Sequence, residues 1–375
     1  MLIYSLVRPA DFPWSGLGGK PTAVPHGTWG AVIERKSAYM NWPTESGEFQ
    51  LGNFQLQSGE VLRNAKLAWK SYGTLNAARD NVILYPCSYG ATHNEMEWLI
   101  GPDGILDPTR WFIIIPNMFS NGLSSGAGNT ADYPALVSQW DNVTAQRRLL
   151  VEHFGIERLH AVYGFSMGGQ QVYHWAAMFP DAVDRAIVLC SSAQTAEHNK
   201  VFLSGLLRTF EAAPEHIGGG RFSAEPLGTL RAIGHIYAGW ALSQDFYRER
   251  LHLTALGAPD LETYLKNDWE ASFQKRRAAD CYAQLVTWLH SDISANTLYG
   301  GDFAKALGAI KAKVLLMPSE TDLYFRVADN ALEMGHLAKA ELLPIPSIWG
   351  HRGGNPSANP VDKAFVKAAV RRWLD

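Results

Sequence analysis

The sequence predicts an α/β protein in which helices flank a mostly parallel central sheet and a helical segment interrupts the alternation of strands and helices. Short runs rich in Val, Ile and Leu recur along the chain, and stretches with apolar residues at helical spacing lie between them. This recurrence stops in the second half of the chain and then resumes. The length of 375 residues suits one large domain with an insertion.

The composition is typical of a folded chain with a large core, since 47% of the residues are hydrophobic and 18% are charged. The chain has 33 Lys and Arg against 36 Asp and Glu, so its formal charge of −3 leaves no basic surplus to bind nucleic acid. A small molecule is therefore the expected partner. The 13 tryptophans indicate either a bulky core or an apolar pocket that needs walls.

The three cysteines, Cys87, Cys190 and Cys281, form an odd set without C-x-x-C spacing, which argues against a disulfide framework and against a zinc site. We therefore expect a reducing, cytoplasmic location and neither a metal nor another cofactor. The N-terminal residues lack the basic region and the cleavage site of a signal peptide. No apolar run approaches the roughly 18 residues that span a bilayer, so no membrane partner is expected.

The N-terminal part of the chain divides into two segments. Residues 1–45 are rich in Pro and Gly without a sustained period, which predicts an irregular arm or an extension ahead of the domain, with Met40 as an alternative start. Residues 47–73 then alternate apolar and polar residues around Ser58 and Gly59, a pattern typical of an antiparallel hairpin.

The runs rich in Val, Ile and Leu suit strands of a parallel sheet that is covered on both faces. They occupy residues 81–86, 110–116, 158–164, 185–190 and 313–318. Residues 139–155 and 168–180 between them have the spacing of helices, and the second helix is expected to end at Pro180.

Residues 194–300 contain no strand-like run, and segments with helical periodicity dominate them. One such segment places four apolar residues on a single stripe: Leu261, Leu265, Trp269 and Phe273. The strand and the final helix that follow need the earlier sheet to pack on. We therefore predict an α/β core of residues 46–193 and 301–375, with residues 194–300 inserted into it as a helical lid.

Residues 164–168 read Gly-Phe-Ser-Met-Gly and lie between a strand-like run and a helical run, which is the setting of a nucleophile elbow. The turn is so tight that the flanking glycine positions of the motif must lack a Cβ atom, and it presents the serine hydroxyl at a helix N-terminus. Ser166 is therefore the candidate nucleophile, and the Met167 amide is a candidate oxyanion donor. The alternative is an ordinary glycine-rich turn.

A serine hydroxyl needs a base that is oriented by an acid, and in this arrangement the chain order is Ser, then Asp or Glu, then His. Asp322 follows the strand at residues 313–318 and is the candidate acid, with Glu320 as the alternative. His351 follows another strand-like run and precedes the last helix, so it is the candidate base.

Three further segments are candidates for contact with substrate. The loop at residues 87–93 follows an early strand and is expected to supply the second oxyanion donor; Cys87 within it is interpreted as a buried structural cysteine rather than a nucleophile. Residues 122–129 lack the ending of a phosphate loop and are interpreted as a substrate-side loop. His198 and Asn199 either line the pocket or cap the first helix of the insertion.

Several segments together resemble the homoserine O-acetyltransferase-like branch of the α/β-hydrolase superfamily. The resemblance rests on residues 51–62, 67–84, 92–117, 141–150, 163–181 and 191–202. It implies a triad of Ser166, Asp322 and His351, and an oxyanion hole formed by the amides of Tyr89 and Met167. It also implies a helical lid and a homodimer paired through that lid. Acetyltransferases of this kind pass an acetyl group from acetyl-CoA to homoserine through an acyl-serine.

One departure from the family pattern bears on the substrate. True homoserine acetyltransferases have an aspartate after the catalytic histidine, suited to the substrate's ammonium group, whereas Arg352 stands here. Its charge disfavours homoserine and favours an anionic or neutral substrate, so Arg352 is a candidate substrate-binding residue. The usual H-A-L-T-G segment is also replaced, by Cys-Ser-Tyr-Gly-Ala at residues 87–91.

These observations predict a serine hydrolase that cleaves a carboxylic ester or related acyl compound. A CoA-dependent acyltransferase is the alternative, and a non-catalytic binding protein with a hydrolase fold is a third possibility. We expect an aromatic-walled acyl pocket under the lid. The tryptophans available for it are Trp240, Trp269 and Trp288 in the insertion and Trp98, Trp175 and Trp349 near the other site segments.

Overall fold

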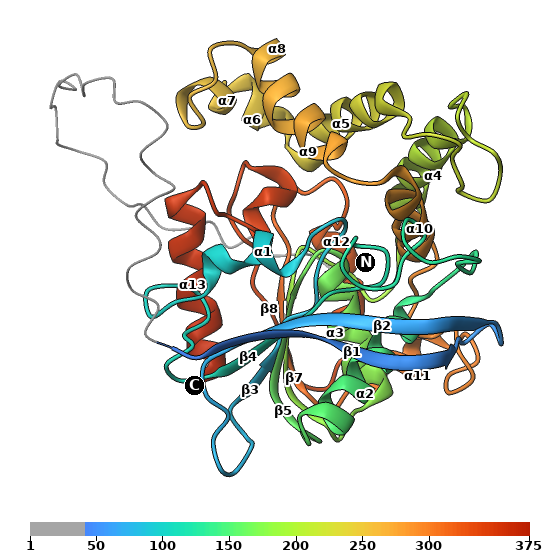
Figure 1. The fold of residues 1–375 in the computed structure, drawn as a ribbon. Helices are drawn as coiled ribbons and strands as arrows, with labels where there is room; N and C mark the ends of the chain where they lie inside the picture. Colours follow the sequence, from blue (N-terminus) through green and yellow to red (C-terminus); the bar gives the residue numbers. More distant parts are fainter. Residues whose placement is uncertain (1–41) are drawn as a thin grey trace, which may run out of the picture. The chain divides into compact units, whose positions relative to one another are not determined.

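An eight-stranded sheet runs through residues 42–375, the part of the chain that the computed structural model describes (Figure 1). Its strand order is β1-β2-β4-β3-β5-β6-β7-β8. The strands from β3 onward are parallel, and β1 and β2 join them antiparallel at one edge. The strands are β1 Thr44–Gln55, β2 Val61–Tyr72, β3 Val82–Leu84, β4 Phe112–Pro116, β5 Leu159–Phe165, β6 Val183–Leu189, β7 Lys313–Met317 and β8 Ala340–Leu342. Residues 1–41 of the predicted arm, including Met40, lie outside the described residues. β1 begins at Thr44.

The hairpin formed by β1 and β2 follows the alternation in the sequence. Leu51, Phe54 and Leu62 are buried, whereas the polar residues between them face outward. The turn at Ser58 and Gly59 is closed by a hydrogen bond from the Leu56 amide to the Glu60 carbonyl at 2.9 Å. Side chains alternate between the two faces of a strand, and register shifts between Gln50 and Phe54 interrupt this alternation, so Leu51 and Phe54 are both buried although they are three residues apart. The predicted hairpin is confirmed.

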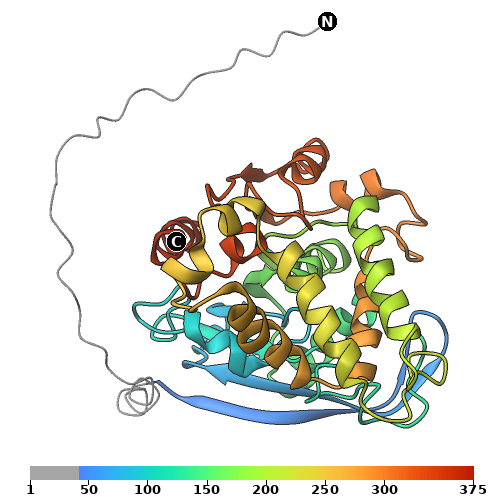
Figure 2. The same ribbon diagram turned by 90° about the horizontal axis from the view of Figure 1, so that it is seen from above.

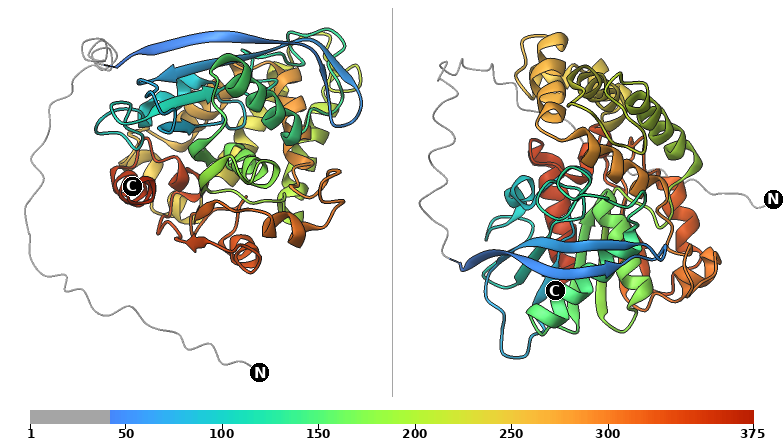
Figure 3. Two further views of the ribbon diagram at one scale, coloured as in Figure 1. Left: turned by 90° about the horizontal axis from the view of Figure 1, so that it is seen from below. Right: turned by 45° about the vertical axis from the view of Figure 1, so that its right-hand side comes forward.

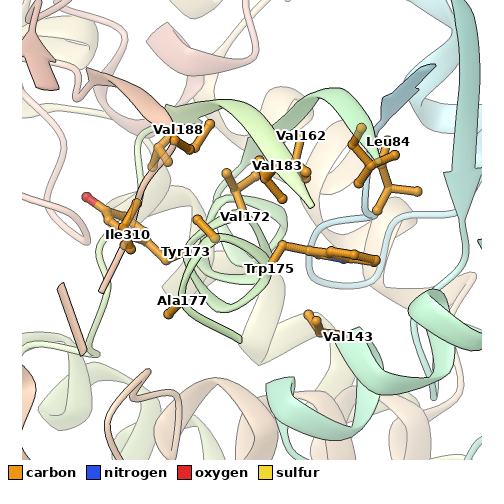
Figure 4. Close-up of a cluster of buried hydrophobic side chains, with 14 of the residues drawn as sticks. Leu84, Val143, Val162, Val172, Tyr173, Trp175, Ala177, Val183, Val188 and Ile310 are labelled. Atoms are coloured by element: carbon orange, nitrogen blue, oxygen red, sulfur yellow. The ribbon is translucent and has the colours of Figure 1, made fainter. Parts of the chain in front are cut away.

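Helices cover both faces of the parallel strands, which explains why those strands are apolar throughout. Figure 4 shows the packing on one face, where Val172 and Trp175 of α3 lie against Val162 of β5 and Val188 of β6, all of them buried. Burying each such side chain contributes about 1.5–3 kcal/mol. This face is covered by α2 Gln139–Arg148, α3 Met167–Met178, α11 Phe303–Gly308 and α12 Val327–Met334, and the other by α1 His93–Met96 and α13 Pro360–Leu374.

Seven α-helices lie within residues 194–300, which separate β6 from β7 in the sequence together with α11, although these two strands are parallel neighbours in the sheet. They gather on one side of the sheet, as the views in Figures 2 and 3 show. On the predicted stripe, Trp269 and Phe273 are buried and Leu265 is half-buried, but Leu261 is 47% exposed. The helices are α4 Glu197–Glu211, α5 Leu227–Ala241, α6 Gln244–Arg248, α7 Leu251–Thr254, α8 Leu261–Tyr264, α9 Ala271–Gln274 and α10 Ala278–Leu289. Within residues 42–375, no helix has the length and apolar character needed to cross a membrane.

A buried carboxyl group joins three elements behind the elbow helix. Glu333 of α12 is 3% exposed and accepts hydrogen bonds from the Tyr173 hydroxyl of α3, the Asn330 amide and, at 2.7 Å, the Ala193 backbone N–H. Burial raises the pKa of Glu333 to about 7 despite these three donors.

This raised pKa predicts a pH-dependent contribution to stability. The folded protein holds the Glu333 proton more tightly than the unfolded chain, so the contribution is complete below about pH 4.5 and is lost as the pH rises through about 7. The free energy of unfolding of the wild type relative to Glu333→Gln should therefore fall by roughly 2–3 kcal/mol between pH 5 and pH 8. Urea unfolding of both proteins at both pH values measures this difference in the free energy of unfolding. If the difference is the same at pH 5 and pH 8, the raised pKa of Glu333 is contradicted.

Candidate active site

Ser166 lies at the turn between β5 and α3, and the two flanking glycines explain how the chain makes that turn. A Cβ atom on Gly164 would lie 2.3 Å from the Gly168 carbonyl oxygen, and one on Gly168 would lie 2.5 Å from the Pro86 carbonyl oxygen. Ser166 itself has φ 58° and ψ −130°, a conformation that L residues rarely adopt. The backbone strain and the excluded side chains are those expected of a nucleophile elbow.

His351 connects Ser166 to Asp322 in a continuous hydrogen-bonded chain. The Ser166 Oγ lies 2.9 Å from His351 Nε2, and the Asp322 Oδ2 lies 2.7 Å from His351 Nδ1. All three residues are almost entirely buried: Ser166 is 4% exposed, His351 7% and Asp322 0%. With Nδ1–H donated to the carboxylate, Nε2 is left as the acceptor that a base toward the serine hydroxyl requires.

Asp322 is held in place by its own loop after β7. Its Oδ1 accepts the backbone N–H groups of Tyr324 at 2.8 Å and Phe325 at 3.3 Å, which leaves Oδ2 for the histidine. Glu320, the alternative acid, is exposed and has no hydrogen bond to His351. Between Asp322 and Glu320, the geometry favours Asp322.

Thr321 ties the Asp322 loop to the His351 loop. Its Oγ1 donates to the Ser347 carbonyl at 2.8 Å and accepts the Gly350 N–H at 3.1 Å. Gly350 has φ +60°, and a Cβ atom there would lie 2.8 Å from the backbone nitrogen of Ser243 in the insertion. Thr321 could not be predicted as a site residue, because nothing in the sequence distinguishes its hydroxyl from those of other loop residues.

The candidate oxyanion donors belong to two segments that meet next to Ser166. Met167 is the first residue of α3, and Tyr89 follows β3 in a loop whose Ser88 hydroxyl donates to the Phe165 carbonyl at 2.7 Å. Among residues 42–375, neither the Tyr89 amide nor the Met167 amide has a hydrogen-bond acceptor. Both amides are therefore available to a substrate oxygen.

A pocket of about 190 Å³ contains Ser166 and His351. Aromatic rings form most of its apolar wall, and burial raises the pKa of Tyr324 well above its usual value, so the phenol stays protonated. The rings are Tyr89, Phe165, Tyr237, Trp269, Phe273, Trp288 and Tyr324. Of the six tryptophans named above, Trp269 and Trp288 line this pocket, whereas Trp175 packs in the core beneath the sheet.

The three candidate substrate residues have different surroundings. Arg352 lines the pocket, and its guanidinium lies over the ring of Trp269 at 4.6 Å from the ring centre. His198 is exposed beside Trp240, with the ring centres 5.0 Å apart, and does not line the pocket. Asn199 is buried, and within the described residues its side chain has no hydrogen-bond partner. Neither residue caps α4, whose N-cap position is Ala196.

A cysteine lies close to the acid and the base. Potential ligand atoms of Cys190, Asp322 and His351 lie within 4.8 Å of one another. Both ring nitrogens of His351 already bind Ser166 and Asp322, and burial, with the Asp322 carboxylate second, raises the pKa of the Cys190 thiol well above its usual value. This geometry suits proton transfer to and from Ser166 better than coordination of a metal.

Cys87 is also buried, and burial raises the pKa of its thiol, so the thiolate needed for nucleophilic attack is disfavoured. This agrees with its interpretation as a structural residue. Gly122 of the predicted substrate-side loop lines a separate hollow of about 580 Å³, which shares Asp268, Ser272 and Arg276 with the pocket of Ser166.

The chain is similar to proteins of known family. A family model described as the alpha/beta hydrolase fold matches residues 81–347. A probable esterase of Corynebacterium glutamicum is 37% identical over 81% of this chain and 88% of its own length. The ethyl acetate hydrolase of Pseudomonas veronii is 36% identical over 82% of this chain and 90% of its own length.

Acyltransferases and solved structures are also among the similar proteins. The homoserine O-acetyltransferase of Acidiphilium cryptum is 30% identical over 79% of this chain and 87% of its own length. The crystal structure of an acetylester hydrolase from Corynebacterium glutamicum superimposes with a TM-score of 0.82 at 34% identity, covering 88% of this chain and 96% of that one. The predicted fold and resemblance are confirmed: the chain belongs to the α/β-hydrolase family, in a branch with both esterases and homoserine O-acetyltransferases.

Proposed function

We propose that this protein is a serine ester hydrolase that forms an acyl-enzyme at Ser166. The observation that carries the proposal is the hydrogen-bonded chain from Ser166 through His351 to Asp322. His351 takes the Ser166 proton as the Oγ attacks the ester carbonyl, and Asp322 stabilises the resulting imidazolium. The amides of Tyr89 and Met167 hold the developing oxyanion.

The acyl-enzyme is then resolved by water. His351 returns its first proton to the departing alcohol, then takes a proton from a water molecule as that water attacks the acyl carbonyl. The ester C–O bond breaks in the first half. In the second half the acyl C–Oγ bond breaks as His351 passes the water proton to the Ser166 Oγ, which releases a carboxylic acid and restores the Ser166 hydroxyl. A binding protein without catalysis would have no use for this complete arrangement, which argues against the third possibility.

We place the acyl group in the aromatic pocket and assign residues 194–300 the role of a lid over it. The pocket volume of about 190 Å³ and its ring-lined wall favour a short, apolar acyl chain. The names of the acetylester and ethyl acetate hydrolases among the relatives support the same class of substrate. The helices α5, α9 and α10 supply much of the wall, through Tyr237, Phe273 and Trp288.

Acyl transfer from CoA is the second candidate, and the 30% identity to a homoserine O-acetyltransferase favours it. The two activities share Ser166, Asp322 and His351 and differ only in the acceptor. Arg352 in the pocket presents a positive charge, which repels the ammonium group of homoserine and weighs against that acceptor. Hydrolysis is therefore the activity we propose.

The choice between hydrolysis and transfer has a direct assay. We expect the purified protein to hydrolyse p-nitrophenyl acetate and ethyl acetate in water, and to release no thiol from acetyl-CoA when homoserine is added. Release of nitrophenolate, and of acetic acid at constant pH, measures the first activity, while a thiol reagent measures the second. Rapid acetylation of homoserine would make the protein an acyltransferase instead.

Arg352 is proposed to set the charge preference of the site. Arg352→Asp should lower kcat/KM for the anionic monoethyl succinate by about tenfold relative to the neutral ethyl butyrate, because the favourable charge becomes repulsive. Steady-state kinetics with both esters measure this ratio. Arg231→Asp is the matched control, since Arg231 is an exposed arginine of α5 outside the pocket. An equal effect of Arg352→Asp on both esters would contradict the assignment.

The cellular setting belongs to the same proposal. Cys87, Cys190 and Cys281 are all buried and unpaired, which supports a reducing, cytoplasmic location. The proposal includes the homodimer paired through the lid, for which Val201 of α4, an apolar side chain that is 68% exposed, is a candidate contact residue. Sedimentation should show a dimer for the wild type and a smaller species for Val201→Glu, and equal sedimentation of the two would remove Val201 from the interface.

A further inference from the structure

The loop that carries Tyr89 is held by the insertion through a buried polar side chain. Gln284 of α10 is 1% exposed and shares its stripe with the buried Cys281 and Trp288. A buried amide is unfavourable unless both its oxygen and its nitrogen are paired. The Gln284 Oε1 accepts the Gly90 backbone N–H at 2.6 Å, and its Nε2 donates to the Phe119 carbonyl at 3.0 Å.

These contacts fasten one side of a tight turn. Residues 88–91 form a turn that is closed by a hydrogen bond from the Ala91 N–H to the Ser88 carbonyl at 3.1 Å, with Gly90 at φ +63°. Ser88 fastens the other side through its 2.7 Å hydrogen bond to Phe165, the residue before Ser166. The Tyr89 amide therefore lies between one anchor on the elbow and one anchor on α10.

The same loop touches the insertion at two more points. The Tyr89 hydroxyl donates to the Cys281 carbonyl at 3.3 Å. Gly90 lies so close to Arg276 that a Cβ atom there would be 2.8 Å from the Arg276 Nε. Outside the insertion, Asn121 donates to the Ala91 carbonyl at 3.0 Å. Within residues 194–300, only Gln284 hydrogen-bonds to the backbone of the turn, and it does so at the peptide between Tyr89 and Gly90, so it is the group of the insertion that fixes this peptide plane.

We propose that Gln284 is a positioning residue that makes the oxyanion hole depend on the insertion being in place. This rests on the proposed function, because it concerns the Tyr89 amide as an oxyanion donor. A donor must lie about 2.7–3.1 Å from the oxyanion, and a shift of about 1 Å lowers the rate by up to two orders of magnitude. Gln284 acts on the reaction through this geometry and does not touch substrate itself.

The test compares two variants that remove hydrogen bonds between α10 and the core: two at Gln284, with Gly90 and Phe119, and one at Thr287, with Val137. Gln284→Met removes the acceptor of the Gly90 N–H and keeps the length of the side chain. Thr287→Val is the matched control, since Thr287 is a buried residue of α10 whose hydroxyl donates to the Val137 carbonyl at 2.6 Å, outside the Tyr89 loop. Thermal unfolding of both variants measures the structural effect that they share.

We expect Gln284→Met to lower kcat for p-nitrophenyl acetate by about 10- to 100-fold with KM changed by less than about threefold, because only the transition state carries the oxyanion. A trifluoromethyl ketone forms an adduct with Ser166 that carries an oxyanion, so its inhibition constant should rise by the same factor. The matching methyl ketone should bind as before. Thr287→Val should keep kcat within about threefold of the wild type.

Gln284→Glu provides a second variant in case Gln284→Met does not fold, since it keeps an acceptor for Gly90 and should retain more activity. Equal losses in Gln284→Met and Thr287→Val, or equal weakening of both ketones, would overturn the role of Gln284. A Ser166→Ala protein assayed in parallel separates the two proposals. If that protein still turns over, the proposed function fails; if it is inactive while Gln284→Met is fully active, only the present inference fails.

Discussion

Replacing Ser166 by Ala should lower kcat/KM for p-nitrophenyl acetate by about five orders of magnitude or more, because covalent catalysis loses its nucleophile. The Ser166 Oγ is the only side-chain atom within hydrogen-bond distance of His351 Nε2 in the described part of the chain. Alanine keeps the Cβ atom and leaves the backbone of the elbow unchanged. Initial rates with and without the variant enzyme, beside its thermal unfolding midpoint, measure the effect.

Ser191→Ala is the matched control for that experiment. Ser191 is a buried serine two residues after the end of β6, and its Oγ has no hydrogen-bond partner among residues 42–375. Its loss should leave kcat/KM within a few-fold of the wild type, because the Ser191 hydroxyl hydrogen-bonds to neither His351 nor Asp322. A Ser166→Ala protein with near-normal activity would remove the proposed mechanism altogether.

Replacing Asp322 by Asn should lower kcat by about 10⁴-fold while KM stays within a few-fold. The Asp322 carboxylate accepts three hydrogen bonds, one from His351 Nδ1 and two from the backbone N–H groups of Tyr324 and Phe325. The amide of asparagine places an N–H₂ group at one of these positions. If the asparagine oxygen accepts the backbone N–H groups, the N–H₂ group faces His351 Nδ1 and donates to it. The ring proton of the neutral histidine then lies on Nε2, which can no longer accept the Ser166 proton.

Glu320→Gln is the control for Asp322, because Glu320 is the other acid in the same loop and is exposed. Its loss should change kcat by less than about twofold, as for other exposed residues away from the site. Steady-state kinetics of both variants across pH 6–9 measure the comparison. If Glu320→Gln loses activity and Asp322→Asn keeps it, the acid role belongs to Glu320.

The fold was predictable because its signals are local. Uninterrupted apolar runs such as residues 110–116 and 313–318 mark strands that are buried on both faces, and they became β4 and β7. The elbow was predictable because its motif is local, and the requirement for Gly164 arises within the turn itself, whereas Gly168 is required by Pro86, which follows the neighbouring strand β3. The stripe that begins at Leu261 was only partly right, because Leu261 is exposed and only Trp269 and Phe273 are fully buried.

The site residues that follow a fixed order along the chain could be predicted. Those that depend on contacts between distant segments could not. The order of Ser166, Asp322 and His351 along the chain follows from the order of the strands that carry them. Thr321 and Gln284 carried no comparable signal in the sequence. A glutamine on the apolar stripe of α10 indicates only that its buried amide has hydrogen-bond partners, without saying which.

By itself, the sequence determined the fold class, the position of the elbow and the family resemblance, since each depends on residues adjacent in the chain. The tertiary structure alone decided that Asp322 rather than Glu320 faces His351, that Trp269 and Trp288 line the pocket, and that Gln284 reaches the Tyr89 loop. These outcomes depend on contacts between segments up to nearly two hundred residues apart, such as that between Gly90 and Gln284. The local pattern of residues does not specify such contacts, because side-chain packing between separate elements determines them.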